Sequence, residues 1–269
     1  MNTTQVIAAG DCEIAGLPKK RNSKHAQDAE GRFFYVKTDY CLKRQESNPT
    51  WLANELLFYE VAKHNSLRMP FSSILEIDGR LYWGTEFRYD RSTLQTETSS
   101  RAELLAIACR SHRELVALCR ALLLDVALLN SDRQPWNILA DQVDIQPRLW
   151  FFDHEKSLLG DGKEAADSPS GDLGRIHPDS ISDRKLRDYC ACDHINRFVV
   201  SGLTDVEICE MFVSLDLTGS VLRLAKAKCP QSWLSVELFS RLESFLQAWW
   251  HHLRDGMRRD AAYFRRHFQ

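Results

Sequence analysis

The residues with the clearest chemical potential lie in a polar loop that follows a long apolar stretch of the sequence. Asp132 and Asn137 stand five positions apart in this loop. A carboxylate can accept the proton of an attacking hydroxyl group, and an amide oxygen is a hard ligand that suits Mg²⁺. Together they can bracket a phosphoryl group during its transfer. The pair therefore predicts phosphoryl-transfer chemistry, while ordinary turn chemistry is the alternative for an Asp and an Asn in a polar loop.

A second candidate metal ligand follows 21 positions after Asp132. The apolar run Leu149–Phe152 ends in Asp153, and His154 and Glu155 come next. An apolar run of this length predicts a short strand. A carboxylate at the end of such a strand is well placed to bind a cation such as Mg²⁺. Asp153 is therefore a candidate magnesium ligand.

A strand that ends in a lysine and a helix that carries a glutamate precede this loop. Aromatic and β-branched residues predict a strand over Phe33–Lys37. The spacing of apolar residues predicts a helix over Trp51–His64, and Glu55 lies in its first half, 18 positions after Lys37. The two side chains form either an ordinary surface ion pair or part of a nucleotide site.

The remaining elements separate into a strand-rich first third and a helix-rich remainder. The dipeptide Asp78-Gly79 predicts a tight hairpin turn between strands over Ser73–Ile77 and Arg80–Gly84. The other expected elements are two helices over Ser99–Asn130, short strands over Asn137–Ala140 and Leu149–Phe152, a mobile loop over Gly160–Gly174 and a helical stretch over Ser232–His267. This order predicts an α+β protein of two unequal lobes, a small β-rich N-lobe over residues 1–88 and a larger helical C-lobe over residues 89–269.

Composition and charge limit the class of protein. Of the 269 residues, 44% are hydrophobic and 27% are charged, as in a globular protein with a sizeable core. Lys plus Arg number 35 and Asp plus Glu number 37, so the net charge gives no general attraction to nucleic acid or to an anionic membrane. The most apolar run, Ala121–Leu129, is short and is interrupted by Asp125. We therefore expect no direct nucleic-acid partner and no membrane span.

Cysteine usage and the first residues indicate the compartment. The eight cysteines lie far apart in the sequence, which favours reduced thiols. The segment Cys190–His194 lacks the paired Cys-x-x-Cys spacing of a zinc site. Met1–Gly10 lacks a basic segment followed by an apolar one, the pattern of a secretion signal. A cytoplasmic protein is the expectation.

Taken in order, these parts resemble the HipA-like and phosphatidylinositol-kinase-like branch of the protein-kinase superfamily. The loop Asp132–Asn137, which reads Asp-Arg-Gln-Pro-Trp-Asn, is similar to that family's Asp-Arg-His-x-x-Asn. Asp153–Glu155 is similar to its Asp-His-Gly or Asp-Phe-Gly. Thr50–Glu55 resembles its Asn-Glu-bearing helix, and Arg68–Pro70 resembles the Pro-containing turn that follows it. The resemblance covers about Gly16–Leu159 and implies a two-lobed protein-kinase-like fold.

The resemblance also implies roles for individual residues. Lys37 would hold the α- and β-phosphates of ATP, with Glu55 as its partner. Asp132 would be the catalytic base, and Asn137 and Asp153 would bind magnesium. Because His154 and Glu155 replace the Phe-Gly of ordinary protein kinases, the switching of that phenylalanine is not expected here.

The parts that would cover the nucleotide depart from ordinary kinases. No Gly-x-Gly-x-x-Gly motif precedes Lys37. The segment Gly16–Lys24 offers hydrogen-bond donors and positive charge, with Ser23 and Lys24 nearest the following strand, and resembles the phosphate-covering loop of HipA-like proteins. A basic surface loop is the alternative.

The hinge of the resemblance falls directly after the predicted hairpin. The segment Thr85–Phe87 stands where the backbone of such kinases meets adenine, which makes Glu86 and Phe87 candidate nucleotide contacts.

The function implied is that of an ATP-dependent, magnesium-using phosphotransferase. A HipA-like serine/threonine protein kinase is the leading hypothesis, with a Ser or Thr hydroxyl of a protein as the acceptor, and a regulatory partner protein is compatible with it. A lipid or small-molecule kinase is the alternative within catalysis, because the same base serves any hydroxyl. A pseudokinase that only binds is the alternative from another class, and it is disfavoured by the presence of Lys37, Asp132, Asn137 and Asp153.

Overall fold

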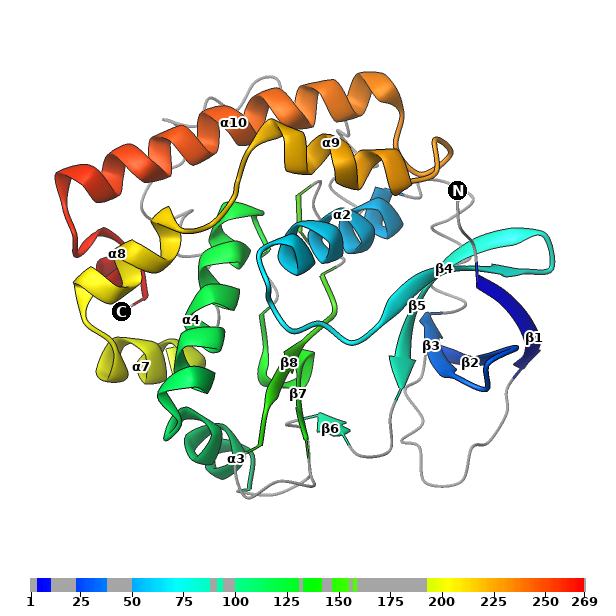
Figure 1. Ribbon diagram of the computed structural model, residues 1–269, viewed down its shortest axis with the longest axis horizontal. Coiled ribbons are helices and arrows are strands. Elements are labelled where there is room, and N and C mark those ends of the chain that lie inside the picture. Colours follow the sequence, from blue (N-terminus) through cyan, green and yellow to red (C-terminus); the bar gives the residue numbers. More distant parts are fainter. Residues whose placement is uncertain are drawn as a thin grey trace.

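The computed structural model describes residues 4–10, 23–37, 50–87, 91–93, 100–130, 133–141, 147–154, 157–158 and 193–268. Side chains are described for most of these residues. Five strands gather at one end of the molecule, and the remainder consists of helices with a small three-stranded sheet beside them (Figure 1).

Five strands near the N-terminus close into a small barrel. The strands are β1 (Thr4–Gly10), β2 (Ser23–Asp28), β3 (Phe33–Lys37), β4 (Ser72–Ile77) and β5 (Arg80–Phe87). Their order is β1-β2-β3-β5-β4, and a parallel pairing of β1 with β4 closes the barrel. Closure leaves no unpaired edge strand. The interior is filled by apolar side chains, namely Ala26, Phe34, Val36, Leu75 and Tyr82.

The hairpin between β4 and β5 confirms the prediction from its turn dipeptide. Asp78 and Gly79 have φ angles of 52° and 74°, and Ile77 pairs with Arg80. Two consecutive positive φ angles are the requirement of a two-residue type I′ turn. The strand expected over Phe33–Lys37 is also confirmed, with the same bounds.

One helix lies between the barrel strands β3 and β4 in the sequence, and two more helices and a second sheet follow β5. Helix α2 (Thr50–His64) precedes β4, and helices α3 (Ser100–Cys109) and α4 (His112–Ala127) form the pair expected over Ser99–Asn130. Strands β6 (Arg91–Thr93), β7 (Ile138–Asp141) and β8 (Leu149–Phe151) form an antiparallel sheet in the order β6-β7-β8. Asn137 closes the short 3-10 helix η1 (Pro135–Asn137) instead of opening the strand, because the fixed φ of Pro135 favours a helical turn at that point.

The C-terminal region consists of helices α7 (Asp193–Gly202), α8 (Asp205–Val213), α9 (Gly219–Lys228), α10 (Val236–Arg259) and α11 (Tyr263–Phe268). The single helical stretch expected over Ser232–His267 is thus two helices. The break falls at Asp260, whose carboxylate accepts a hydrogen bond from the N–H of Ala262 at 3.0 Å. Such local bonds from Asp side chains compete with helix continuation. The loop expected over Gly160–Gly174 lies outside the described residues.

Helix α2 is the element that joins the two regions. It contacts strand β5 of the barrel and helix α9 of the C-terminal region, and Figure 1 shows it beside α9. Every side chain from Trp51 to Tyr59 is buried. A helix that is buried all round has neighbours on all its faces.

Two adjacent tryptophans of α10 bind the C-terminal end of α4. The indole N–H of Trp249 donates to the carbonyl of Val126 at 3.1 Å, and that of Trp250 donates to the carbonyl of Ala127 at 2.8 Å. The last carbonyls of a helix have no partner within the helix. The C-terminal helices therefore fix the point at which the chain leaves α4 for the Asp132 loop. Within the described residues, no helix has both the length and the apolar content needed to cross a membrane.

Replacing Trp250 with Phe tests this contact. We expect the free energy of unfolding to fall by about 2–4 kcal/mol, because the buried carbonyl of Ala127 loses its donor and the smaller ring leaves space. Urea denaturation followed by circular dichroism measures the change. Val236→Ala, at an exposed position of the same helix, is the control and should change the value by less than about 0.5 kcal/mol. A Trp250→Phe curve that overlays the wild-type curve would contradict the prediction.

Candidate active site

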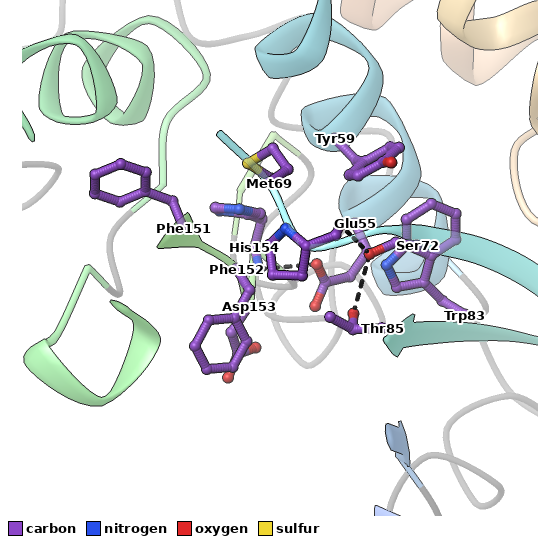
Figure 2. Close-up of a pocket in the computed structure, with 11 residues that line it drawn as sticks. Glu55, Tyr59, Met69, Ser72, Trp83, Thr85, Phe151, Phe152, Asp153 and His154 are labelled. Atoms are coloured by element: carbon purple, nitrogen blue, oxygen red, sulfur yellow. Dashed lines mark hydrogen bonds between the residues drawn. The ribbon is translucent and has the colours of Figure 1, made fainter. Parts of the chain in front are cut away.

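A small pocket lies where α2, β5 and the segment after β8 meet (Figure 2). Its walls include Glu55 and Tyr59 from α2, Thr85 from β5, and Asp153 and His154 after β8. Its volume of about 10 Å³ is room for about one water molecule. The pocket thus brings together residues that lie up to 99 positions apart in the sequence.

Glu55 reaches directly to the backbone beside Asp153. Its side chain is buried, and its Oε2 accepts a hydrogen bond from the N–H of His154 at 2.9 Å. Figure 2 shows the Glu55 carboxylate pointing toward this segment. Hydrogen bonds to a charged acceptor are stronger than those between neutral groups. The bond therefore fixes α2 to the predicted metal-binding segment, although the two residues lie 99 positions apart.

Asp153 occupies a strained backbone conformation. Its φ of 64° lies in the left-handed region, which costs a residue with a β-carbon about 1–2 kcal/mol. The residues on both sides are held. Phe152 accepts a hydrogen bond on its carbonyl from Arg133 at 3.1 Å, and the N–H of His154 is bound by Glu55. Strain of this kind persists where the surroundings over-determine the backbone, and it is concentrated at functional sites.

A buried ion pair joins helix α4 to the segment that follows it. The side chains of Arg133 and Asp125 are both fully buried, and the guanidinium binds the carboxylate at 2.8 Å and 2.9 Å through Nε and Nη2. Asn130 donates a further hydrogen bond to Asp125 at 2.7 Å. Burial raises the pKa of Asp125 above its ordinary value, while Arg133 and Asn130 oppose this because they favour the ionised carboxylate. Each of the two buried charges is therefore stabilised by the other.

The same guanidinium joins the two segments that carry the predicted magnesium ligands. Nη1 donates to the carbonyls of Asn137 and Phe152, each at 3.1 Å. Nη2 lies 3.0 Å from Nδ1 of His154. Because arginine can only donate, Nδ1 must accept, and the proton of the neutral imidazole then resides on Nε2. The ring of His154 also stacks on Phe58, with centroids 3.7 Å apart.

Asn137 and Asp153 lie at neighbouring strand ends. Ile138 pairs with Phe151, and the N–H of Phe152 donates to the carbonyl of Asn137 at 3.2 Å. Asn137 is fully buried and Asp153 is partly exposed. One amide and one carboxylate fit Mg²⁺, which usually takes one or two protein ligands and completes its shell with phosphate and water. Among the described residues, no group of three or more His, Cys, Asp or Glu side chains is arranged to hold a metal ion.

The other predicted site residues are placed to different degrees. Asp132 lies outside the described residues, between Asn130 and Arg133, which both bind Asp125. Lys37 ends β3, and its backbone is paired with Ser23 of β2, next to the pairing of Lys24 with Val36. The side chains of Ser23, Lys24 and Lys37 are not among those described.

The predicted hinge residues Glu86 and Phe87 are the last two residues of β5 and pair with Phe34 and Phe33. The N–H of Glu86 already donates to the carbonyl of Phe71 at 2.7 Å. The backbone donor at Glu86 is therefore in use in this structure. The neighbouring Thr85 lines the pocket instead, and its hydroxyl lies 3.3 Å from that of Ser72.

Sequence reasoning missed the Asp125 carboxylate, which appeared only as an interruption of an apolar run. A single acid in an otherwise apolar helix is a signal for a buried partner, because an unpaired buried charge is costly. Arg133, eight positions later, is the basic residue that pairs with Asp125. Of the cysteines, the described ones at positions 109, 119, 209 and 229 are free thiols, and Cys190 and Cys192 lie outside the described residues.

A strand-built first region, a helix with a buried glutamate, and a loop and strand pair that carry Asn and Asp define the two-lobed α+β protein-kinase-like fold. The structure of the Helicobacter pylori proinflammatory kinase CtkA is similar, with a TM-score of 0.57 over 98% of this chain and 100% of that chain at 10% sequence identity. This likeness confirms the kinase-like fold expected from the sequence and, at that identity, concerns the fold alone.

Two further solved structures have lower TM-scores. HipA from Shewanella oneidensis, in its complex with HipB and operator DNA, has a TM-score of 0.42 and 13% identity over 83% of this chain and 60% of that chain. Rio2 kinase from Chaetomium thermophilum has a TM-score of 0.42 and 16% identity over 92% of this chain and 72% of that chain. No protein-family model and no curated protein sequence matches the chain.

A double-mutant cycle tests the dependence of Asp125 on Arg133. Arg133→Met should lower the free energy of unfolding by about 3–5 kcal/mol, because it leaves a buried carboxylate without its partner. Asp125→Leu combined with Arg133→Met should recover part of that loss, with a coupling energy of at least about 1 kcal/mol. Chemical denaturation of the four proteins gives the cycle. Arg113→Met, at an exposed position of α4, is the matched control. Additive effects at positions 125 and 133 would show that the pair does not act as a unit.

Proposed function

We propose that the protein is an ATP-dependent phosphotransferase that moves the γ-phosphate of ATP to an alcohol group. The observation that carries this proposal is the bond between buried Glu55 and the backbone N–H of His154. It places the glutamate of α2 beside Asp153, at the strand end next to Asn137. Kinase chemistry requires its helix glutamate and its metal-binding aspartate to be in place at the same phosphate site.

Each proposed residue has one task. Asp132 accepts the proton of the attacking hydroxyl, and Asn137 and Asp153 supply oxygen ligands to Mg²⁺. A bound magnesium ion would neutralise charge on the β- and γ-phosphates. Arg133 positions the two proposed ligands, because its guanidinium binds the backbone carbonyls of Asn137 and of Phe152, the residue before Asp153.

The barrel supplies the proposed nucleotide contacts. Lys37 binds the α- and β-phosphates and pairs with Glu55. Ser23 is the register partner of Lys37, which supports a role for Ser23 and Lys24 in covering the phosphates. Glu86 and Phe87, the last two residues of β5, are the proposed contacts to adenine.

A protein Ser or Thr hydroxyl is the proposed acceptor, by resemblance to HipA-like kinases. A lipid or small-molecule acceptor and a pseudokinase remain as the outcomes that the tests below separate. A regulatory partner protein, a cytoplasmic location and a lobe boundary between residues 88 and 89 stay predictions.

Removal of the proposed base tests the reaction. Asp132→Ala should lower phosphate transfer by ~10²–10⁴, the usual range for the loss of a general base, while ATP binding is kept. Single-turnover transfer from γ-labelled ATP, with phosphoproteomics after induced expression, measures the rate and identifies the acceptor. Glu210→Ala, at an exposed acidic position, is the control. Transfer by Asp132→Ala at the wild-type rate would remove Asp132 from the mechanism, and ATP binding without transfer by the wild type would favour a pseudokinase.

Two variants test the proposed pair of Lys37 and Glu55, and the second separates the charge of Glu55 from its hydrogen bond. Lys37→Met should weaken ATP binding by about tenfold or more, because it removes the cation at the phosphates. Glu55→Gln should weaken it as well, although a glutamine oxygen can still accept the N–H of His154. Calorimetric titration of ATP, with and without magnesium, measures both affinities. Wild-type affinity in Lys37→Met would contradict the nucleotide site at the end of β3.

A further inference from the structure

The end of α2 farthest from the barrel is bound to the C-terminal helices. Asn65, directly after the helix, is buried, and its side-chain amide binds both backbone groups of one residue. Its Oδ1 accepts from the N–H of Asp216 at 2.7 Å, and its Nδ2 donates to the carbonyl of Asp216 at 3.2 Å. Nδ2 also donates to the carbonyl of Val61 within α2 at 2.9 Å. The amide therefore ties the last turn of α2 to the segment between α8 and α9.

The chain after Asn65 is bound to the catalytic region as well. The carbonyl of Arg68 accepts from the N–H of Phe151 in β8 at 3.1 Å. The guanidinium of Arg68 donates to the buried carboxylate of Glu114 in α4 at 2.5 Å, and the same carboxylate accepts from the N–H of Leu149 at 2.9 Å. The segment between α2 and β4 is thus part of the helical region and its sheet.

Other links to α2 are weaker. Glu60 pairs with Lys228 at 2.5 Å, and His64 lies 2.9 Å from Asp216. Each pair has at least one partner with about half its side chain exposed, and such pairs contribute little to stability. The Asn65 side chain is buried, so water competes less for its two hydrogen bonds to the backbone of Asp216. These bonds therefore constrain α2 more effectively than the two exposed ion pairs do.

We propose that Asn65 is a positioning residue for the phosphotransferase reaction, a role that rests on the proposed function. By holding α2 to Asp216, it keeps Glu55 at the N–H of His154 and so keeps Asp153 in place. Asn65 lies ten residues from Glu55, about 15 Å along the helix axis. Because a helix moves as a stiff rod, release of this end shifts the end that carries Glu55. Helix α2 is then held in place by the C-terminal region as well as by its contacts with strand β5 of the barrel.

The His154 amide provides a readout that a merely structural role would not move. Its N–H is bound to Glu55, so its hydrogen exchange reports the position of α2 at the site. We expect Asn65→Ala to speed exchange at His154 by about tenfold or more, because two hydrogen bonds that hold α2 are lost. We also expect kcat/KM for MgATP to fall by ~10- to 100-fold, the cost of a small misplacement at a distance from the chemistry.

Two controls separate positioning from loss of stability. Thr204→Ala removes the side-chain cap of α8, where Thr204 accepts from the N–H of Glu207, and so destabilises the same region without touching α2. Asp216→Ala removes the carboxylate but keeps the two backbone groups that Asn65 binds. Both should leave exchange at His154 within about twofold of wild type. If Asn65→Ala does not fold, Asn65→Asp retains an acceptor for the Asp216 N–H and should give a smaller rise in exchange.

The outcomes are distinct. Wild-type exchange at His154 in Asn65→Ala, or an equal rise in Thr204→Ala, would overturn the positioning role. Faster exchange in Asn65→Ala alone, together with the loss of kcat/KM, supports it. If the wild type neither binds nor turns over ATP, the proposed function fails, and the exchange comparison still decides whether Asn65 holds α2 at His154.

Discussion

The geometry of the site depends on the ion pair between Arg133 and Asp125. Removing two charges from water is costly, and the cost is recovered only when the geometry is good and the remaining hydrogen-bonding groups are satisfied. Here both guanidinium edges are used, by Asp125 on one side and by the carbonyls of Asn137 and Phe152 on the other. One planar group therefore sets the distance between the loop that contains the proposed base and the strand end that contains Asp153. A lysine could not do this, because its ammonium lacks the planar fork.

The C-terminal helices support this pair from behind. Trp249 and Trp250 bind the last carbonyls of α4, and the N–H of Leu158 binds the carbonyl of Leu128 at 2.8 Å. These bonds fix the end of the helix that carries Asp125. Buried carbonyls are seldom left unpaired, so a change in α10 would alter the start of the loop that carries the proposed base. The helical region is thus a structural part of the site, although it contributes no proposed catalytic side chain.

Asp153 shows how the parts act together. Its left-handed backbone is unfavourable in isolation, and it is retained because Arg133 binds the residue before it and Glu55 binds the residue after it. The first of these contacts comes from the loop after α4 and the second from α2. The orientation of Asp153, a proposed metal ligand, therefore depends on the positions of both elements. The position of α2 depends in turn on Asn65 and the segment after it.

The sequence by itself determined the elements whose signal is local. The positive φ angles that Asp78-Gly79 favours produced the hairpin, a run of aromatic and β-branched residues produced β3, and helical spacing produced α2. The order of these elements and the Asp132 loop indicated the kinase-like fold. Only the tertiary structure decided which distant residues meet, such as Glu55 with His154 and Asn65 with Asp216. Periodicity records the environment of a residue but not the identity of its partner, since a buried carboxylate or amide is stabilised by any suitably placed donor. The partner is fixed only when packing brings two segments together, and that is a property of the whole chain.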